Sequence, residues 1–188
     1  MSAQDKAARS VIHLSVPVRE TEATLYGQEH EREAVAQLED VLGLTVTEGK
    51  KVVPSGHRWL VCIPDGLVEE DGIVEVKCPY KCQDRTFESL AEIDENFCLK
   101  MLPTGELRLD RGHDYYYQVQ GMLNMMDRQA CYFAVWSPKQ FHHEVIYQDK
   151  QLWQNVIFPK LLEFYRFTTE MIFIYTDNYH IQETCPRQ

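Results

Sequence analysis

The stretch from Leu60 to Pro79, LVCIPDGLVEEDGIVEVKCP, constrains this chain more than any other part of it. Two apolar runs, Leu60–Ile63 and Ile73–Cys78, flank a segment that is rich in Asp, Glu and Gly. Short apolar runs with β-branched residues, bounded by turn-forming residues, are typical of strands. We therefore expect two adjacent strands here, forming a hairpin at the centre of the fold.

The second of these strands carries two charged residues. Side chains alternate between the faces of a strand, so Glu75 and Lys77 are predicted to share one face. The residues that alternate with them, including Cys78, then point the other way, into the core. Asp65 stands where the first strand is expected to end. The sequence therefore predicts an acidic residue close to a Glu-Lys pair on a neighbouring strand.

This combination suits the hydrolysis of a phosphodiester. The reaction builds negative charge on the phosphate, and Mg²⁺ binds oxygen ligands, commonly one or two carboxylates, while it keeps several waters. The bound ion polarises the phosphoryl oxygen and lowers the pKa of a bound water. We predict that Asp65, Glu75 and the Val76 carbonyl hold the ion. Lys77 would orient the attacking water or stabilise the developing charge.

Each residue also has a simpler interpretation when it is taken alone. Pro-Asp-Gly at 64–66 is a common turn former. Glu75 and Lys77 are compatible with the solvated face of an amphipathic strand. The combination favours the metal site, because the strand around Glu75 is otherwise apolar and has no other charged residue.

Length and composition restrict the class of protein. At 188 residues the chain is expected to form one domain. No apolar run approaches the roughly 20 residues that span a bilayer, and the N-terminus lacks an apolar signal core. Six dispersed cysteines indicate reduced thiols. We expect an intracellular protein, cytoplasmic or nuclear, that is neither secreted nor bound to a membrane.

The net charge of −10 argues against a protein that coats nucleic acid by bulk electrostatics. A nuclease can still be acidic overall, because its carboxylates add negative charge while its basic residues cluster elsewhere.

A helix is predicted over Tyr26–Gly43, with an apolar stripe at helical spacing and a glycine at its end. Glu31 is expected on the core side of this helix, where a carboxylate is costly unless it meets a cation or a hydrogen-bond donor. The alternative is a glutamate in the first turn that complements the helix dipole.

The remaining elements predict an α/β arrangement, a central mixed β-sheet flanked by helices. They are strands at Leu44–Val46 and Lys51–Val53, a helix at Thr86–Ile93, a hairpin of Phe97–Leu102 with Glu106–Leu109, a helix at His113–Met126, strands at 131–137 and 144–148, and a helix at Gln151–Phe173. An N-terminal arm (1–24), a main domain (25–175) and a C-terminal tail (176–188) are expected.

Four motifs in this order resemble those of the YqaJ-like viral recombinase family, over about residues 25 to 170. They are Gly27-x-x-x-Glu31, Pro64-Asp65-Gly66, Glu75-Val76-Lys77 and Tyr115-x-x-Gln118. This family includes the phage lambda exonuclease and belongs to the PD-(D/E)XK nucleases. The resemblance therefore implies the restriction-endonuclease-like fold.

The resemblance implies the same metal ligands as above, for Mg²⁺ with Mn²⁺ as a substitute, and the same role for Lys77. It adds Glu31, which would complete the acidic site around a second metal or water. It also adds Gln118, which would brace the site from its helix, with Tyr115 one turn earlier on the same side.

The implied activity is hydrolysis of duplex DNA in recombination or repair, as a 5′-to-3′ exonuclease. Phage members form ring-shaped trimers, and a single-strand annealing protein is a further expected partner. Phage relatives also carry a region before the Gly27 helix that grips the 5′ phosphate, and the 26 residues here offer no counterpart. An endonuclease of the same fold and a catalytically silent binding protein therefore remain as alternatives.

A zinc site is a separate candidate. Cys78, Cys82 and the His142-His143 pair carry suitable ligand types, but they lack the paired spacing of such sites. Packing of Cys78 in the core is the favoured interpretation.

Overall fold

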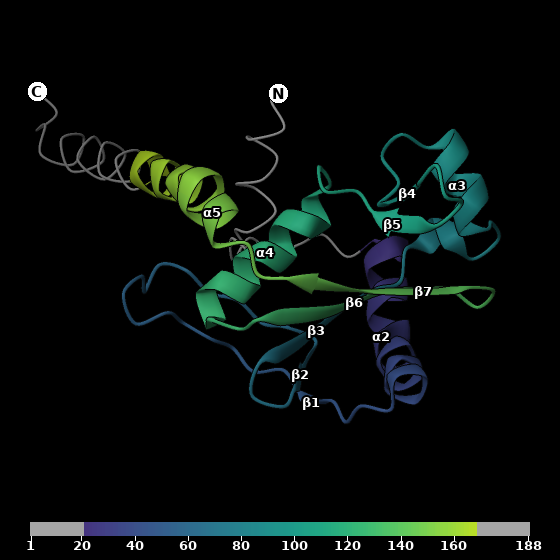
Figure 1. Cartoon of the computed structure of the whole chain (residues 1–188), viewed down its shortest axis with the longest axis horizontal. Coiled ribbons are helices and arrows are strands. Elements are labelled where there is room, and N and C mark those ends of the chain that lie inside the picture. Colours follow the sequence, from purple (N-terminus) through teal and green to yellow (C-terminus); the bar gives the residue numbers. More distant parts are fainter. Residues whose placement is uncertain (1–20, 169–188) are drawn as a thin grey trace, which may run out of the picture.

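A computed structural model describes residues 21–168, which form a five-stranded sheet covered by helices (Figure 1). The strand order is β1-β2-β3-β6-β7; β3 and β6 run parallel and the other neighbours antiparallel. The strands are β1 (Thr47–Glu48), β2 (Gly66–Val68), β3 (Gly72–Lys77), β6 (Ala130–Trp136) and β7 (Phe141–Tyr147). The predicted α/β fold with a mixed central sheet is confirmed.

Two helices pack on this sheet through separate core clusters. Helix α2 (Glu22–Leu42) buries Ala34 and Leu38 in one cluster, together with Val74 and Val76 of β3. Helix α4 (Asp114–Met126) buries its apolar residues in the other cluster, which also contains Ile73. The alternation of side chains along β3 therefore sends successive residues toward opposite helices.

Helix α2 is longer than its apolar stripe predicts. It begins at Glu22, where Thr21 and Thr24 form a reciprocal capping box, rather than at Tyr26. It ends at Leu42, and Gly43 terminates it as predicted, with φ at 64°, a left-handed conformation that favours glycine. The predicted arm (1–24) thus overlaps the start of α2, and residues 1–20 lie outside the described part.

The strand predicted at Leu60–Ile63 is wrong. Cys62 forms only an isolated bridge with Val52, and the strand that pairs with β3 is β2, inside the segment predicted to be a turn. Leu60 is buried instead against Ile157 and Leu161 of the C-terminal helix. An apolar run by itself does not distinguish a strand from a loop that packs on a helix.

A long connection joins β3 to β6, as a parallel pair requires. It contains η1 (Tyr80–Cys82), α3 (Phe87–Ile93), the antiparallel pair β4 (Leu99–Met101) and β5 (Leu107–Leu109), and α4. The predicted helix, hairpin and Tyr-rich helix are all confirmed.

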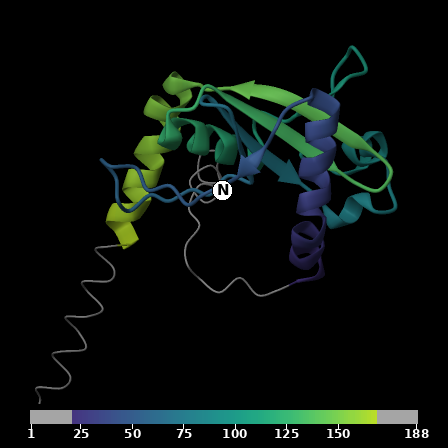
Figure 2. The ribbon, with the colours of Figure 1, turned by 90° about the horizontal axis from the view of Figure 1, so that it is seen from below.

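The C-terminal helix lies at the opposite end of the sheet from α2 (Figure 2). It comprises α5 (Lys150–Leu152), a π-helical turn η2 (Trp153–Ile157) and a helical continuation to 168. The π turn precedes Pro159, which has no N–H group to continue the ladder. Residues 169–173 of the predicted helix and the predicted tail lie outside the described residues. No helix within 21–168 is long and apolar enough to cross a membrane.

Candidate active site

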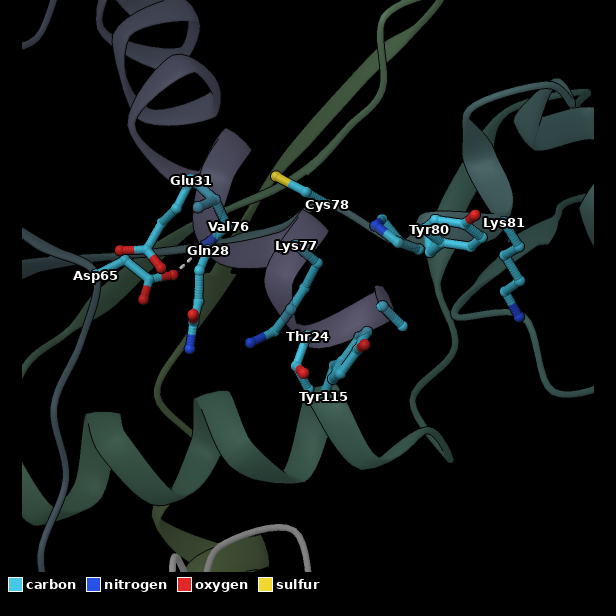
Figure 3. Close-up of a pocket in the computed structure, with 13 residues that line it drawn as sticks. Thr24, Gln28, Glu31, Asp65, Val76, Lys77, Cys78, Tyr80, Lys81 and Tyr115 are labelled. Atoms are coloured by element: carbon cyan, nitrogen blue, oxygen red, sulfur yellow. Dashed lines mark hydrogen bonds between the residues drawn. The ribbon is translucent and has the colours of Figure 1, made fainter. Parts of the chain in front are cut away.

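A pocket of about 720 Å³ opens where β3 ends, between α2 and the first turn of α4 (Figure 3). Its walls include Glu31, Asp65, Lys77 and Tyr115, which come from four different segments of the chain. Glu75 does not line the pocket and lies buried, with 1% of its surface exposed. The structure thus places the five predicted catalytic residues in or directly behind one pocket, with Gln118 in contact with Glu75.

Asp65 is fixed to β3 by two hydrogen bonds. Its backbone N–H donates to the Val74 carbonyl at 3.1 Å, and its Oδ2 accepts from the Val76 N–H at 2.7 Å. Burial raises the pKa of the Asp65 carboxyl, while Lys77 and the Val76 N–H act in the opposite direction. Asp65 directly precedes β2 rather than following the strand predicted before it, yet it still meets β3.

A close backbone approach supports this position. A Cβ on Gly49 would lie 1.7 Å from the carbonyl oxygen of Pro64, so no side chain fits there without a shift of the backbone. Gly49 therefore lets the 49–52 segment pass directly beside the residue that precedes Asp65.

Two donors hold Glu75 through one of its carboxylate oxygens. Its Oε1 accepts from Lys77 Nζ and from Gln118 Nε2, the latter at 2.9 Å. Its Oε2 is buried and has no hydrogen-bond partner among residues 21–168. Burial raises the pKa of Glu75 to about 7, against the opposing effect of Lys77. A buried carboxylate oxygen without a donor is unfavourable unless a cation or proton compensates it.

Lys77 stays protonated in this setting. Burial alone would lower its pKa, but the Glu75 and Asp65 carboxylates outweigh burial and raise it. Its Nζ lies 4.9 Å from the centre of the Tyr115 ring. The ammonium is therefore bounded by a carboxylate and an aromatic face, and it points into the pocket (Figure 3).

Glu31 differs from its predicted position. It is exposed at the rim of the pocket rather than facing the core, and its carboxylate points toward that of Asp65 (Figure 3). Partial burial and the Asp65 charge raise its pKa. It lies well beyond the first turn of α2, whose acidic residue is Glu22, so the helix-dipole interpretation is wrong.

The polar pocket residues Thr24, Gln28 and Tyr80 were not predicted from the sequence. The spacing of Thr24, Gln28 and Glu31, four and three positions apart, places them on one face of α2. That spacing was a usable signal once Glu31 had been singled out.

The carboxylate oxygens at this site fit a hard divalent cation that retains waters. Glu75 Oε2 is buried without a partner, and Asp65 Oδ1 accepts no hydrogen bond within residues 21–168. No group of three or more His, Cys, Asp or Glu side chains in this part of the chain is arranged to hold a metal by itself. The candidate ligands are thus few and oxygen-based, as Mg²⁺ tolerates and structural Zn²⁺ does not.

The zinc candidate finds no support in the same residues. Cys78 and Cys82 are buried in two different core clusters. Burial raises the pKa of both thiols to about 12, which disfavours the thiolate that binds zinc.

A model of the YqaJ-like viral recombinase domain matches residues 2–129. The chain belongs to this family. The match to the YqaJ-like domain starts earlier than the resemblance seen in the sequence and ends before β6. No curated protein sequence matches the chain.

Solved structures with the same fold extend the comparison over nearly the whole YqaJ-like chain. An alkaline exonuclease from Laribacter hongkongensis is 18% identical, with a TM-score of 0.67 over 94% of this chain and 93% of that one. Its complex with dAMP gives a TM-score of 0.69 at 18% identity, over 95% and 93%. A phage-related exonuclease from Haemophilus somnus 129PT is 13% identical, with a TM-score of 0.57 over 90% and 82%. The predicted PD-(D/E)XK-type fold is therefore confirmed.

Proposed function

We propose that this YqaJ-like protein is a metal-dependent DNA nuclease, and specifically an exonuclease that degrades duplex DNA from an end in the 5′-to-3′ direction. One observation carries the proposal: Asp65, Glu75 and Lys77 meet at the end of β3, and Glu75 keeps a buried oxygen that has no hydrogen-bond partner within the described residues. The shared fold with an alkaline exonuclease, solved also with dAMP, supports the same chemistry.

Asp65, Glu75 and the Val76 carbonyl would hold Mg²⁺ or Mn²⁺, and Glu31 extends the acidic set at the pocket rim. A divalent ion bound there supplies Lewis acidity toward the phosphate and an acidic water. Lys77 remains charged, so it can donate to a phosphate oxygen or orient a water at the pocket floor. Gln118 holds the Glu75 carboxylate through Oε1, so no described residue needs Oε2 as an acceptor.

The test compares duplex substrates with and without ends. Linear DNA labelled at either the 5′ or the 3′ terminus, and closed circular DNA, are incubated with the protein in Mg²⁺ or EDTA. We expect degradation of linear DNA only, dependent on Mg²⁺, with early release of the 5′ label. Asp65→Ala and Lys77→Ala should each reduce the rate by about 100- to 1000-fold.

Asp40→Asn provides the matched control, because Asp40 is an exposed acid on α2 outside the pocket. Cleavage of closed circles would favour an endonuclease. DNA binding without cleavage under any condition would favour the catalytically silent alternative and reject the proposal.

Assembly belongs to the same proposal. A ring-shaped homotrimer around DNA would let an acidic chain present its basic residues to the duplex, and a single-strand annealing protein would receive the product strand. Sedimentation of the full chain tests the trimer, and a monomer at all concentrations would reject it.

A further inference from the structure

The first two turns of α4 contact both members of the Glu75–Lys77 pair. Gln118 donates to Glu75 Oε1 at 2.9 Å, and Tyr115, one turn earlier, presents its ring to Lys77 Nζ at 4.9 Å. An ammonium within about 6 Å of an aromatic ring centre is attracted by the ring face. One helix therefore restrains the carboxylate and the ammonium separately.

The ring of Tyr115 is itself held in place. His113 caps α4 by accepting a hydrogen bond from the Tyr115 N–H at 3.1 Å, and the two rings lie 4.6 Å apart. Burial raises the pKa of the Tyr115 phenol, so the ring stays neutral. Its position is fixed by the helix start, independently of Lys77.

Lys77 needs such a restraint. Its long side chain can rotate, and the Glu75 carboxylate attracts it toward the protein interior. A contact with Glu75 alone would leave the ammonium free to turn away from the pocket. The Tyr115 ring lines the pocket on the other side and limits that rotation.

We propose that Tyr115 is a positioning residue, whose aromatic face holds the Lys77 ammonium toward the pocket where the phosphate reacts. The ring provides this effect and the hydroxyl is dispensable. The catalytic part of the inference rests on the proposed nuclease function, whereas the Tyr115–Lys77 geometry stands without it.

The experiment compares Tyr115→Phe, which keeps the ring, with Tyr115→Leu, which removes it. We expect Tyr115→Phe to stay within about 2-fold of the wild-type kcat and Tyr115→Leu to lose about 10-fold, equivalent to ~1.4 kcal/mol. The KM for DNA should be unchanged in both variants. The affinity for Mn²⁺, measured by calorimetry, should also be unchanged. Tyr117→Leu makes the same replacement two positions along α4 and should retain full activity.

A spectroscopic readout separates this inference from the proposed function. With ¹³C-labelled lysine, the Lys77 Hε signals should be shifted upfield by the ring in wild type and Tyr115→Phe, and should return to ordinary values in Tyr115→Leu. Lys77→Arg assigns the signal by its loss.

Two results would overturn the inference. Equal loss of kcat in both variants would assign the effect to the hydroxyl, and an unshifted Lys77 signal in the wild type would exclude the ring contact. An inactive wild type with the upfield signal present would reject the nuclease proposal while retaining the geometry.

Discussion

Gln118 of α4 donates a hydrogen bond of 2.9 Å to Glu75 Oε1 of β3, so the helix and the central strand are joined at the candidate active site. The other donor to that oxygen is Lys77. Glu75 is thus oriented both by Lys77 of its own strand and by Gln118, so the position of its carboxylate depends on how α4 docks.

Replacing Gln118 with Ala should slow cleavage by about 10- to 100-fold, because a hydrogen bond to a charged group contributes ~1.5–3 kcal/mol. The loss should fall on kcat in single-turnover assays, since Gln118 does not line the pocket. Gln154→Ala, at an exposed position of the C-terminal helix, is the control. Unchanged kcat in Gln118→Ala would contradict the bracing role.

Replacing Gln120, two positions after Gln118, should reduce stability rather than activity. It is fully buried, donates to the Tyr147 carbonyl at 2.8 Å and accepts from the Asp149 N–H at 2.8 Å. Gln120→Leu leaves both groups unpaired and should reduce the free energy of unfolding by about 2–4 kcal/mol. Urea denaturation measures this, and activity per folded molecule should be retained. A stable but inactive variant would assign Gln120 to the site instead.

The affinity for Mn²⁺ should increase with pH. Burial raises the pKa of Glu75 from 4.5 to about 7, so a bound cation must displace a proton below that pH. Calorimetric titrations from about pH 5.5 to 8.5 should show the increase, and Glu75→Gln should bind weakly and without this dependence. A pH-independent affinity in the wild type would contradict the raised pKa.

The same shift predicts how the metal-free protein responds to pH. The folded-state pKa of Glu75 lies above the unfolded value, so the protonated carboxyl favours folding. This contribution is complete below about pH 4.5 and is lost as the pH rises through about 7. Relative to wild type, metal-free Glu75→Gln should therefore gain stability across that window.

Gly49→Ala should disturb the candidate active site, although Gly49 is distant in sequence from Asp65. The new Cβ would meet the Pro64 carbonyl oxygen at 1.7 Å, and the backbone shift would move Asp65. We expect a loss of about 1–3 kcal/mol in stability and weaker Mn²⁺ binding. Gly56→Ala is the matched control, because nothing lies within 4 Å of its Cβ. Unchanged Mn²⁺ affinity in Gly49→Ala would separate Gly49 from the site.

The sequence was sufficient for the centre of the site. The alternation along β3 correctly predicts that Glu75 and Lys77 lie on one face. Strand β3 lies between two apolar clusters, so its two charged side chains pair with each other. The family motifs also correctly bring Glu31 and Gln118 to this region. Their roles toward a metal and substrate stay predictions.

The segments around the site could not be derived in the same way. Strand β2 has only three residues, and it lies where Asp, Glu and Gly indicate a turn. Leu60, at the start of the apolar run, packs on the C-terminal helix, a contact between segments far apart in sequence, while Ile63 at its end is exposed. The exposure of Glu31 was not predicted, because the apolar stripe of α2 does not show where the helix extends past the edge of the sheet.

The parallel pairing of β3 with β6 also bears on how the protein matures during synthesis. Asp65, Glu75 and Lys77 emerge from the ribosome before Tyr115 and Gln118, and pairing across so long a connection is a slow step of folding. A nascent chain would therefore carry its acidic residues and lysine without the helix that orients them. Catalytic competence should arrive with the last long-range contact rather than with the appearance of helices and strands.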